Sequence, residues 1–177
     1  DRAYKRFYPA IDPLASWSRY LAQLSPWYDE HLGTGWARRV EEMQRLLGRG
    51  EDVAQMMQVT GEEGVTMDDF VDLLKARFVD MVFLQQDAFD AVDASCPLER
   101  QKALFAMVRD VVTRTYAFET KDAARDFFTR LTGLFKDLNY TASGTAQFRQ
   151  LEDGIDALLA SAPRAPLARP HPAPGAA

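Results

Sequence analysis

The fold of this chain is decided by residues 59–89, which read VTGEEGVTMDDFVDLLKARFVDMVFLQQDAF. Thr66 and Asp69 have the spacing of a capping box, in which two side chains three residues apart satisfy the first free N–H groups of a helix. A helix is therefore expected to begin near Met67. Apolar residues then recur at helical spacing: Met67, Phe70, Val71, Leu74, Phe78, Met81 and Val82. The stretch predicts an acidic turn, a long amphipathic helix and a loop that carries Phe89.

Helical spacing continues along the rest of the chain, and strand-type alternation persists nowhere for more than a few residues. Helices are expected over residues 14–24, from Ser25 and Pro26, over 36–47 with an end at Gly48, over 52–58 with an end at Gly61, from Pro97 to about Phe118, from Thr120 to Leu138, and over 148–159. The sequence thus predicts an all-α bundle of six to seven helices. Residues 1–160 are expected to form this bundle, and the Pro/Ala-rich residues 161–177 a flexible tail.

The composition excludes several classes of function. The 177 residues carry a formal net charge of −5 and no cluster of Lys or Arg, which argues against a nucleic-acid surface or an anionic membrane surface. No apolar run reaches the roughly 20 residues that span a bilayer, so direct membrane insertion is not expected. Cys96 is the only cysteine, which rules out an internal disulfide and fits a reducing compartment. Because the chain starts at Asp1 without a methionine, we expect it to be a piece of a longer protein.

Catalytic motifs are also missing from the sequence. None of the ten glycines is followed by Lys, so the phosphate-binding motif G-x-x-x-x-G-K-[ST] does not occur. No His, Cys, Asp or Glu set has metal-ligand spacing, and no Ser, His and Asp order supports a nucleophile. His31 is interpreted as a surface residue and Cys96 as a small structural residue. Taken alone, the chain is not expected to catalyse a reaction or to hold a metal.

Residues 51–72 contain seven acidic side chains and neither Lys nor Arg, and two interpretations of this charge remain open. Carboxylates in the first turn of a helix are stabilised by the helix dipole, so the charge can simply be a solvated face. Alternatively, an exposed helix–turn–helix tip with this charge meets a basic or polar surface of a partner. The acidic residues of that tip are Glu62, Glu63, Asp68 and Asp69.

The order of acidic loop, amphipathic helix and F-L-Q-Q-D-A-F (residues 83–89) resembles the C-terminal domain of the catalytic A subunit of V-type and A-type rotary ATPases. That family usually writes the last motif F-L-Q-Q-N-A-F, and the catalytic beta subunit of F-type ATP synthases has a related F-L-S-Q-P-F after an acidic loop. Two further segments are similar to the family, Tyr8-Pro9-Ala10-Ile11 before the stretch and Val92-Asp93, Cys96-Pro97 and Arg100-Gln101 after it. The resemblance covers residues 4–108.

The resemblance implies a place beside a nucleotide. In the family the aromatic of the F-L-Q-Q-N-A-F loop stacks on adenine, a role that would fall to Phe89, with Gln86 and Ala88 as neighbours in the pocket. Asp87 replaces the usual Asn and would repel a triphosphate unless it faces solvent or caps a turn. The alternative for Phe89 is a hydrophobic plug between helices. ATP or ADP with Mg²⁺ is expected in the full-length subunit, whose P-loop lies in a preceding domain, and no cofactor in the isolated domain.

The resemblance also implies partners and a place in the cell. The acidic tip would contact the central stalk and couple ATP hydrolysis or synthesis to rotation and ion transport. B subunits would alternate with this subunit in a hexameric head that holds three copies of it. The expected location is cytoplasmic, peripheral to the membrane through the complex. The alternative function is a stand-alone helical protein–protein interaction module without a catalytic role.

Overall fold

The computed structural model describes residues 2–4 and 6–164. Its α-helices are α1 (Ser25–Leu32), α2 (Trp36–Thr60), α3 (Met67–Val79), α4 (Leu98–Thr113), α5 (Lys121–Asn139) and α6 (Ala146–Ser161). A 3-10 turn, η1 (Glu62–Gly64), joins α2 to α3, and a π-helical turn, η2 (Asp80–Leu84), continues α3. The only extended pairing in these ranges is a single bridge between Tyr116 and Arg164. The predicted all-α bundle is confirmed.

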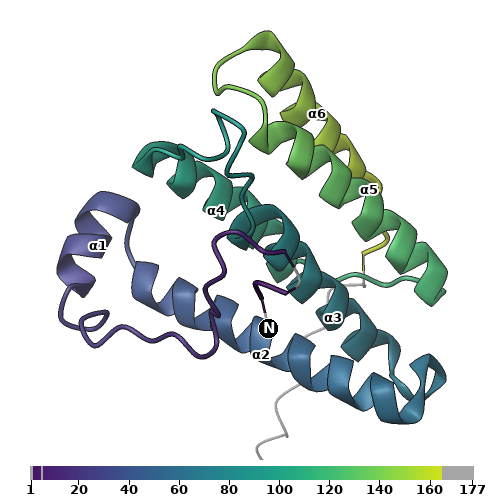
Figure 1. Cartoon of the computed structure of the whole chain (residues 1–177). Coiled ribbons are helices and arrows are strands. Elements are labelled where there is room, and N and C mark those ends of the chain that lie inside the picture. The colour runs from purple at the N-terminus through teal and green to yellow at the C-terminus, as the bar shows by residue number, and fades with distance from the viewer. Residues whose placement is uncertain (1, 5, 165–177) are drawn as a thin grey trace, which may run out of the picture.

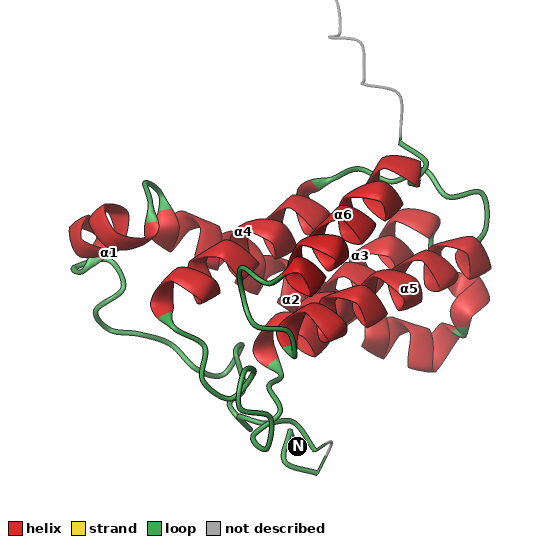
Figure 2. Cartoon of the chain, turned by 90° about the horizontal axis from the view of Figure 1, so that it is seen from above, coloured by secondary structure: helices red, strands yellow, loops and turns green. Residues whose placement is uncertain are grey.

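Helix α3 lies at the centre of the bundle. It packs against α2 on one side and α5 on the other, it also contacts α4, and α6 returns along α5 (Figure 1). Seen from above, α1 lies at the end of the molecule far from α5 (Figure 2). Phe78 of α3 is only 1% exposed, and its ring centroid lies 5.0 Å from that of Phe135 and 6.3 Å from that of Phe128, both on α5. Edge-to-face rings of this kind hold α3 against α5.

Helix α2 corrects one sequence prediction. It runs without a break through Gly48 and Gly50, where the sequence predicted one helix ending at Gly48 and a separate helix over residues 52–58. A glycine inside a helix costs only about 1 kcal/mol relative to alanine, and Gly50 has a packing role. A Cβ at Gly50 would stand 2.3 Å from the Cβ of Ala76, so the bare backbone lets α2 and α3 approach closely.

Two other predicted helical segments are wrong. Residues 14–24, predicted as a helix, form turns at 14–15 and 19–24 with irregular chain between them. Asp12 Oδ1 accepts hydrogen bonds from the N–H groups of Leu14 and Ala15, which closes a local turn at this point. These bonds, the one from Ala15 first, lower the pKa of Asp12. The helix expected to reach Phe118 ends at Thr113, because the next residues turn away in an extended conformation to pack near the end of α6.

The predicted helix starts are correct at two threonines. The Thr66 hydroxyl accepts from the Asp69 N–H, and the Thr120 hydroxyl accepts from the Ala123 N–H. Gly61 ends α2 with φ +74°, as expected for a glycine after a helix.

The segment after residue 160 begins inside the bundle. Ser161 is the last residue of α6, Ala162 is buried, and the Pro163 carbonyl accepts a 2.9 Å hydrogen bond from the Ala117 N–H. The rest of the predicted tail, residues 165–177, lies outside the described residues. Within the described ranges no helix is both long enough and apolar enough to cross a membrane.

Candidate functional site

The loop that follows η2, residues 85–97, is called the exit loop, and hydrogen bonds hold it at its first two residues and at Asp93. The Gln85 N–H donates to the Asp80 carbonyl at 3.0 Å, which closes the π-helical turn. The Gln86 N–H donates to the Tyr8 carbonyl at 2.7 Å, and the Gln86 side-chain Nε2 donates to the Asp93 carbonyl at 2.9 Å. Gln86 therefore joins the start of the exit loop to Tyr8 in the N-terminal segment, and it joins the start of the loop to its later part at Asp93.

Phe89 lies at the tip of the exit loop and is 100% exposed, and Ala88 beside it is also exposed. The predicted alternative of a hydrophobic plug between helices does not fit this position. Asp87 caps the turn beneath the ring, because its Oδ1 accepts the Phe89 N–H at 2.9 Å. A capped turn is one of the two arrangements in which a carboxylate is tolerated here, and it leaves Phe89 presented to solvent.

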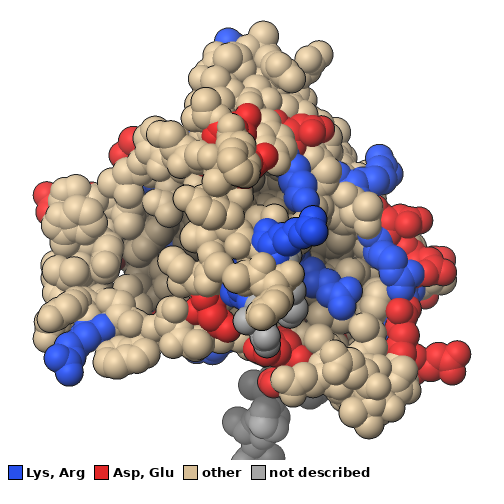
Figure 3. Space-filling model, in the orientation of Figure 1, with Lys and Arg blue, Asp and Glu red and all other residues tan. Residues whose placement is uncertain are grey.

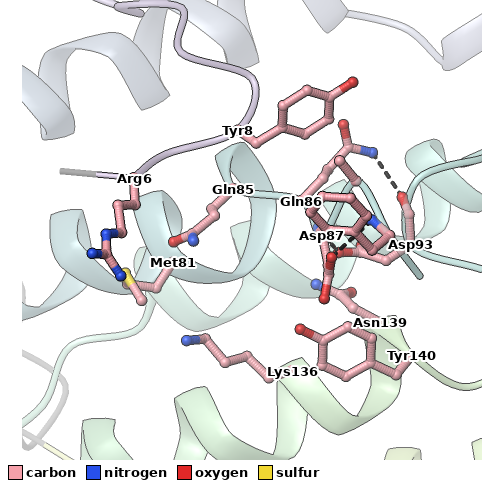
Figure 4. Close-up of a pocket in the computed structure, with 12 residues that line it drawn as sticks. Arg6, Tyr8, Met81, Gln85, Gln86, Asp87, Asp93, Lys136, Asn139 and Tyr140 are labelled. Carbon is pink, nitrogen blue, oxygen red and sulfur yellow. Dashed lines mark hydrogen bonds between the residues drawn. The ribbon is translucent and has the colours of Figure 1, made fainter. Parts of the chain in front are cut away.

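The exit loop forms one wall of a pocket of about 470 Å³ (Figure 4). Its other walls come from the N-terminal segment and from the last turns of α5. The lining residues are Arg6, Tyr8, Met81, Gln85, Gln86, Asp87, Ala88, Phe89, Asp93, Lys136, Asn139 and Tyr140. The three predicted residues, Gln86, Ala88 and Phe89, are thus brought together at one pocket.

Sequence reasoning missed the other walls of this pocket. Tyr8, which is 54% exposed, stands in the Tyr-Pro-Ala-Ile motif, and that motif was its only signal. Lys136 and Asn139 of α5, and Tyr140 directly after this helix, lie about 50 residues after Phe89 in the chain, and only the fold places them there. Figure 4 shows Arg6 and Lys136 on one side of the pocket and Asp87 and Asp93 toward the other.

Two side chains on the acidic side of the pocket, Asp93 and Tyr140, have raised pKa values. Burial raises the pKa of Asp93, and the nearby carboxylates of Asp90 and Asp87 raise it further, although the Asp87 N–H donates to Asp93 Oδ2 at 2.6 Å and opposes the shift. Burial, followed by the Asp87 charge, raises the pKa of Tyr140. Both effects disfavour additional negative charge on this side of the pocket.

The acidic tip lies at the edge of the molecule where α3 and α5 begin, and Figure 3 shows acidic side chains gathered there beside basic ones. Two of its four predicted carboxylates are bound inside the domain. Both Glu62 oxygens accept from Arg125 Nη2 at 2.8 Å. Asp69 Oδ1 accepts from Arg49 at 3.0 Å, and bonds from Thr66 and then Arg49 lower its pKa.

Glu63 and Asp68 are the predicted tip residues that remain exposed, and neither forms an ion pair with any described residue. The turn between them is held from α5, where Lys121 Nζ donates to the carbonyls of Glu62 and Val65. Lys121 and Arg125 also lie over the Phe70 ring, at 5.6 and 5.4 Å from its centroid. The tip is therefore a fixed projection that presents Glu63 and Asp68 outward.

The sequence model of the family described as the C-terminal domain of V and A type ATP synthase matches residues 25–124, more than half of the chain. The chain belongs to this family. It is 39% identical over 158 residues to the V-type ATP synthase alpha chain of Protochlamydia amoebophila, which covers 89% of this chain and 26% of the relative. It is 42% identical over 159 residues to V-type ATP synthase alpha chain 1 of Treponema pallidum, which covers 90% of this chain and 25% of the relative.

The chain thus spans about a quarter of the length of these V-type ATP synthase alpha chains. The matched range includes the acidic tip and the exit loop. Tyr8 and the α5 residues of the pocket lie outside it but inside the described structure. Among the described residues, no group of three or more His, Cys, Asp or Glu side chains could hold a metal ion.

Proposed function

We propose that this chain is the C-terminal domain of the catalytic subunit of a V/A-type ATP synthase or ATPase, where it closes the adenine side of the nucleotide site and couples ATP chemistry to rotation of a central stalk. One observation carries the proposal. In a chain of this family, Phe89 stands fully exposed at the mouth of a pocket formed by three separate parts of the fold.

A nucleobase suits this pocket because its π-face can stack on an exposed ring. Stacking of a base on an aromatic side chain contributes roughly 1–3 kcal/mol in single-stranded nucleic-acid complexes. Phe89 offers a ring whose turn is held by the Asp87 cap, and Tyr8 offers a second exposed ring in the lining of the same pocket. Gln86 acts by fixing the loop, since its side-chain amide is already bonded to the Asp93 carbonyl, and Ala88 leaves room beside the ring.

ATP or ADP with Mg²⁺ would be bound by the full-length subunit. This chain has no P-loop in its sequence, so the phosphates and the metal would be held by residues that it does not contain. The domain would contribute the base-binding wall alone. The full-length subunit would then work in the cytoplasm, in three copies that alternate with B subunits, as the peripheral part of an ion-transporting membrane complex.

The acidic tip would be the surface that meets the central stalk. Because Glu62 and Asp69 are neutralised by Arg125 and Arg49, the exposed pair Glu63 and Asp68 would carry the contact. A complementary stalk surface would be basic, and its attraction would weaken with salt.

The test is to replace Phe89 by Ala in the full-length subunit, assembled in its complex. Loss of the stacking predicts a rise of roughly 5- to 150-fold in the apparent KM for ATP, the factor that corresponds to about 1–3 kcal/mol. Trp17→Ala is the matched control, since Trp17 is an exposed aromatic outside this pocket. An unchanged KM in Phe89→Ala would remove the adenine wall from the proposal.

A further inference from the structure

The N-terminal segment, of which residues 2–4 and 6–8 are described, is tied to the start of the π-helical turn by one ion pair. Arg2 Nη1 and Nη2 both donate to Asp80 Oδ1, at 3.0 and 2.9 Å. The Arg2 side chain is only 13% exposed and the Asp80 side chain 29%. This pair joins residues 78 positions apart in the sequence, and it lies on the path from the N-terminal segment to the exit loop.

Asp80 connects to the exit loop as well. Its carbonyl accepts the Gln85 N–H, and the next N–H along the loop, that of Gln86, donates to the Tyr8 carbonyl. Asp80 therefore holds Arg2 through its side chain and the start of the exit loop through its backbone. Tyr8 lies at one end of this set of bonds, and Phe89 follows Gln86 by three residues in the exit loop; both line the pocket.

The N-terminal segment is also held in an unusual conformation. Arg6 has φ +60°, in the left-handed region that non-glycine residues rarely adopt. The turn around it is closed by the Phe7 N–H, which donates to the Arg2 carbonyl at 3.0 Å, and the Arg2 guanidinium lies 4.3 Å from the centroid of the Phe7 ring. Strained backbone of this kind persists where its surroundings hold it in place, and it concentrates at ligand sites.

We propose that Arg2 and Asp80 form a clasp that sets the distance between Tyr8 and Phe89. Arg2 and Asp80 are then positioning residues for the base-binding pocket. This inference rests on the proposed function for its consequence on nucleotide binding. The clasp itself, however, is a property of this domain and can be measured without a nucleotide. In the full-length subunit, the same clasp would make the pocket sensitive to movement of the segment that leads into Arg2.

The competing explanation is an ion pair that only adds stability. The two explanations differ in which atoms move when the pair is removed. If the pair acts as a clasp, it slows hydrogen exchange of the Gln86 N–H, which bonds to the Tyr8 carbonyl next to the Gln85–Asp80 bond. If the pair only adds stability, its removal leaves the exchange rate of that amide unchanged. The matched control is Arg38→Gln, which removes the exposed ion pair between Arg38 and Glu42 on α2.

The first measurement is amide hydrogen exchange, followed by NMR on the 177-residue chain. Asp80→Asn removes the negative charge from the pair and keeps an oxygen acceptor, and it is expected to speed exchange of the Gln86 amide by about tenfold, the factor that corresponds to about 1.4 kcal/mol. It should also shift the Phe89 resonances, while core amides such as that of Phe78 keep their protection. Unchanged exchange at Gln86 in a variant whose core is intact would overturn the clasp.

The second measurement uses the full-length subunit in its complex. Arg2→Asp and Asp80→Arg are each expected to raise the apparent KM for ATP with little change in kcat, and the double exchange Arg2→Asp/Asp80→Arg should restore part of the loss. Combining Asp80→Asn with Phe89→Ala should raise the apparent KM for ATP by less than the product of the two single increases, because both substitutions act through the Phe89 ring. If Phe89→Ala raises KM but the Arg2 and Asp80 variants do not, the positioning role is wrong. If Phe89→Ala has no effect while Gln86 exchange responds to Asp80→Asn, the proposed adenine wall fails and the clasp stands.

Discussion

Two glycines on α2 should respond in opposite ways to the same substitution. Gly48 and Gly50 lie two residues apart, so they point to different faces of the helix. A Cβ at Gly48 would meet only the Leu14 side chain at 4.0 Å, which is an ordinary contact. A Cβ at Gly50 would stand 2.3 Å from the Cβ of Ala76, closer than real Cβ atoms approach. Ala76 is 6% exposed and sits on the facing helix α3, so neither partner can move aside cheaply.

The magnitudes follow from two opposing effects. Alanine in place of glycine inside a helix stabilises by about 1 kcal/mol through the unfolded chain and the helix propensity. Gly48→Ala should retain this gain. Gly50→Ala adds a clash in a packed interface, where overpacking typically costs about 1–3 kcal/mol. An ordinary contact between carbon atoms is about 3.5–4.0 Å, so α2 and α3 would have to move apart by more than about 1 Å. We therefore take the cost of the clash from the upper end of the range of about 1–3 kcal/mol. The net loss should be about 2 kcal/mol.

The assay is urea unfolding of the 177-residue chain, followed by far-UV circular dichroism. Gly50→Ala/Ala76→Gly is the rescue variant, because removing the facing methyl reopens the interface. It should recover most of the loss, apart from the roughly 1 kcal/mol that a glycine costs in α3. If Gly50→Ala stabilises the chain as Gly48→Ala does, α2 and α3 do not approach at this point and the reasoning is refuted.

Three other predictions follow from the contacts of single residues. Reversing Glu63 and Asp68 to Lys in the full-length subunit should impair coupling of ATP hydrolysis to rotation while the KM for ATP stays constant; a simultaneous change of KM would show that the tip is not a separate surface. Burial raises the pKa of Tyr116 above its usual value of 10, so its contribution to stability is fully present below pH 10 and is lost as the pH rises through the higher folded-state pKa. Tyr116→Phe should therefore flatten the alkaline end of a pH–stability curve, and an unchanged curve would contradict this. Arg100 donates to three carbonyls at the end of α5 and to a serine hydroxyl, so Arg100→Ala should destabilise the chain by about 2 kcal/mol, whereas Arg130→Ala, at an exposed position on α5, should change stability little in the same urea assay.

Local signals in the sequence predicted the parts of the fold that depend on neighbouring residues. Thr66 with Asp69, Thr120 and Gly61 each marked a helix end correctly, because a cap is decided within four positions. Gly48 was misread for the same reason. A glycine signal is ambiguous between a helix end and a close approach, and only the position of α3 shows that the helix continues and that Gly50 serves the approach.

The candidate sites were predictable to the extent that their residues are contiguous. The acidic tip and the first five residues of the exit loop, 85–89, lie in one stretch of 31 residues, and the structure places Gln86, Ala88 and Phe89 at one pocket. The neutralisation of Glu62 could not be predicted, because Arg125 is 63 positions away. The sequence shows seven acids without a base over residues 51–72, yet three of them, Glu62, Asp69 and Asp72, form ion pairs with bases outside this range: Arg49, Lys75 and Arg125.

Helix α5 supplies what the sequence could not show at either site, and this has a mechanical consequence. Its first turns hold the acidic tip through Lys121 and Arg125, and its last turns line the pocket through Lys136 and Asn139. At 1.5 Å per residue, its 19 residues form a rod of about 28 Å. Phe78, Phe128 and Phe135 fix that rod to α3, which begins at the tip and is continued through η2 to the exit loop. The tip and the pocket are therefore joined by two packed helices, α3 and α5. Independent movement of the tip would require the Glu62–Arg125 pair, or the contacts of Phe78 with Phe128 and Phe135, to break. A force on Glu63 or Asp68 would therefore reach Phe89 as a movement of the whole bundle.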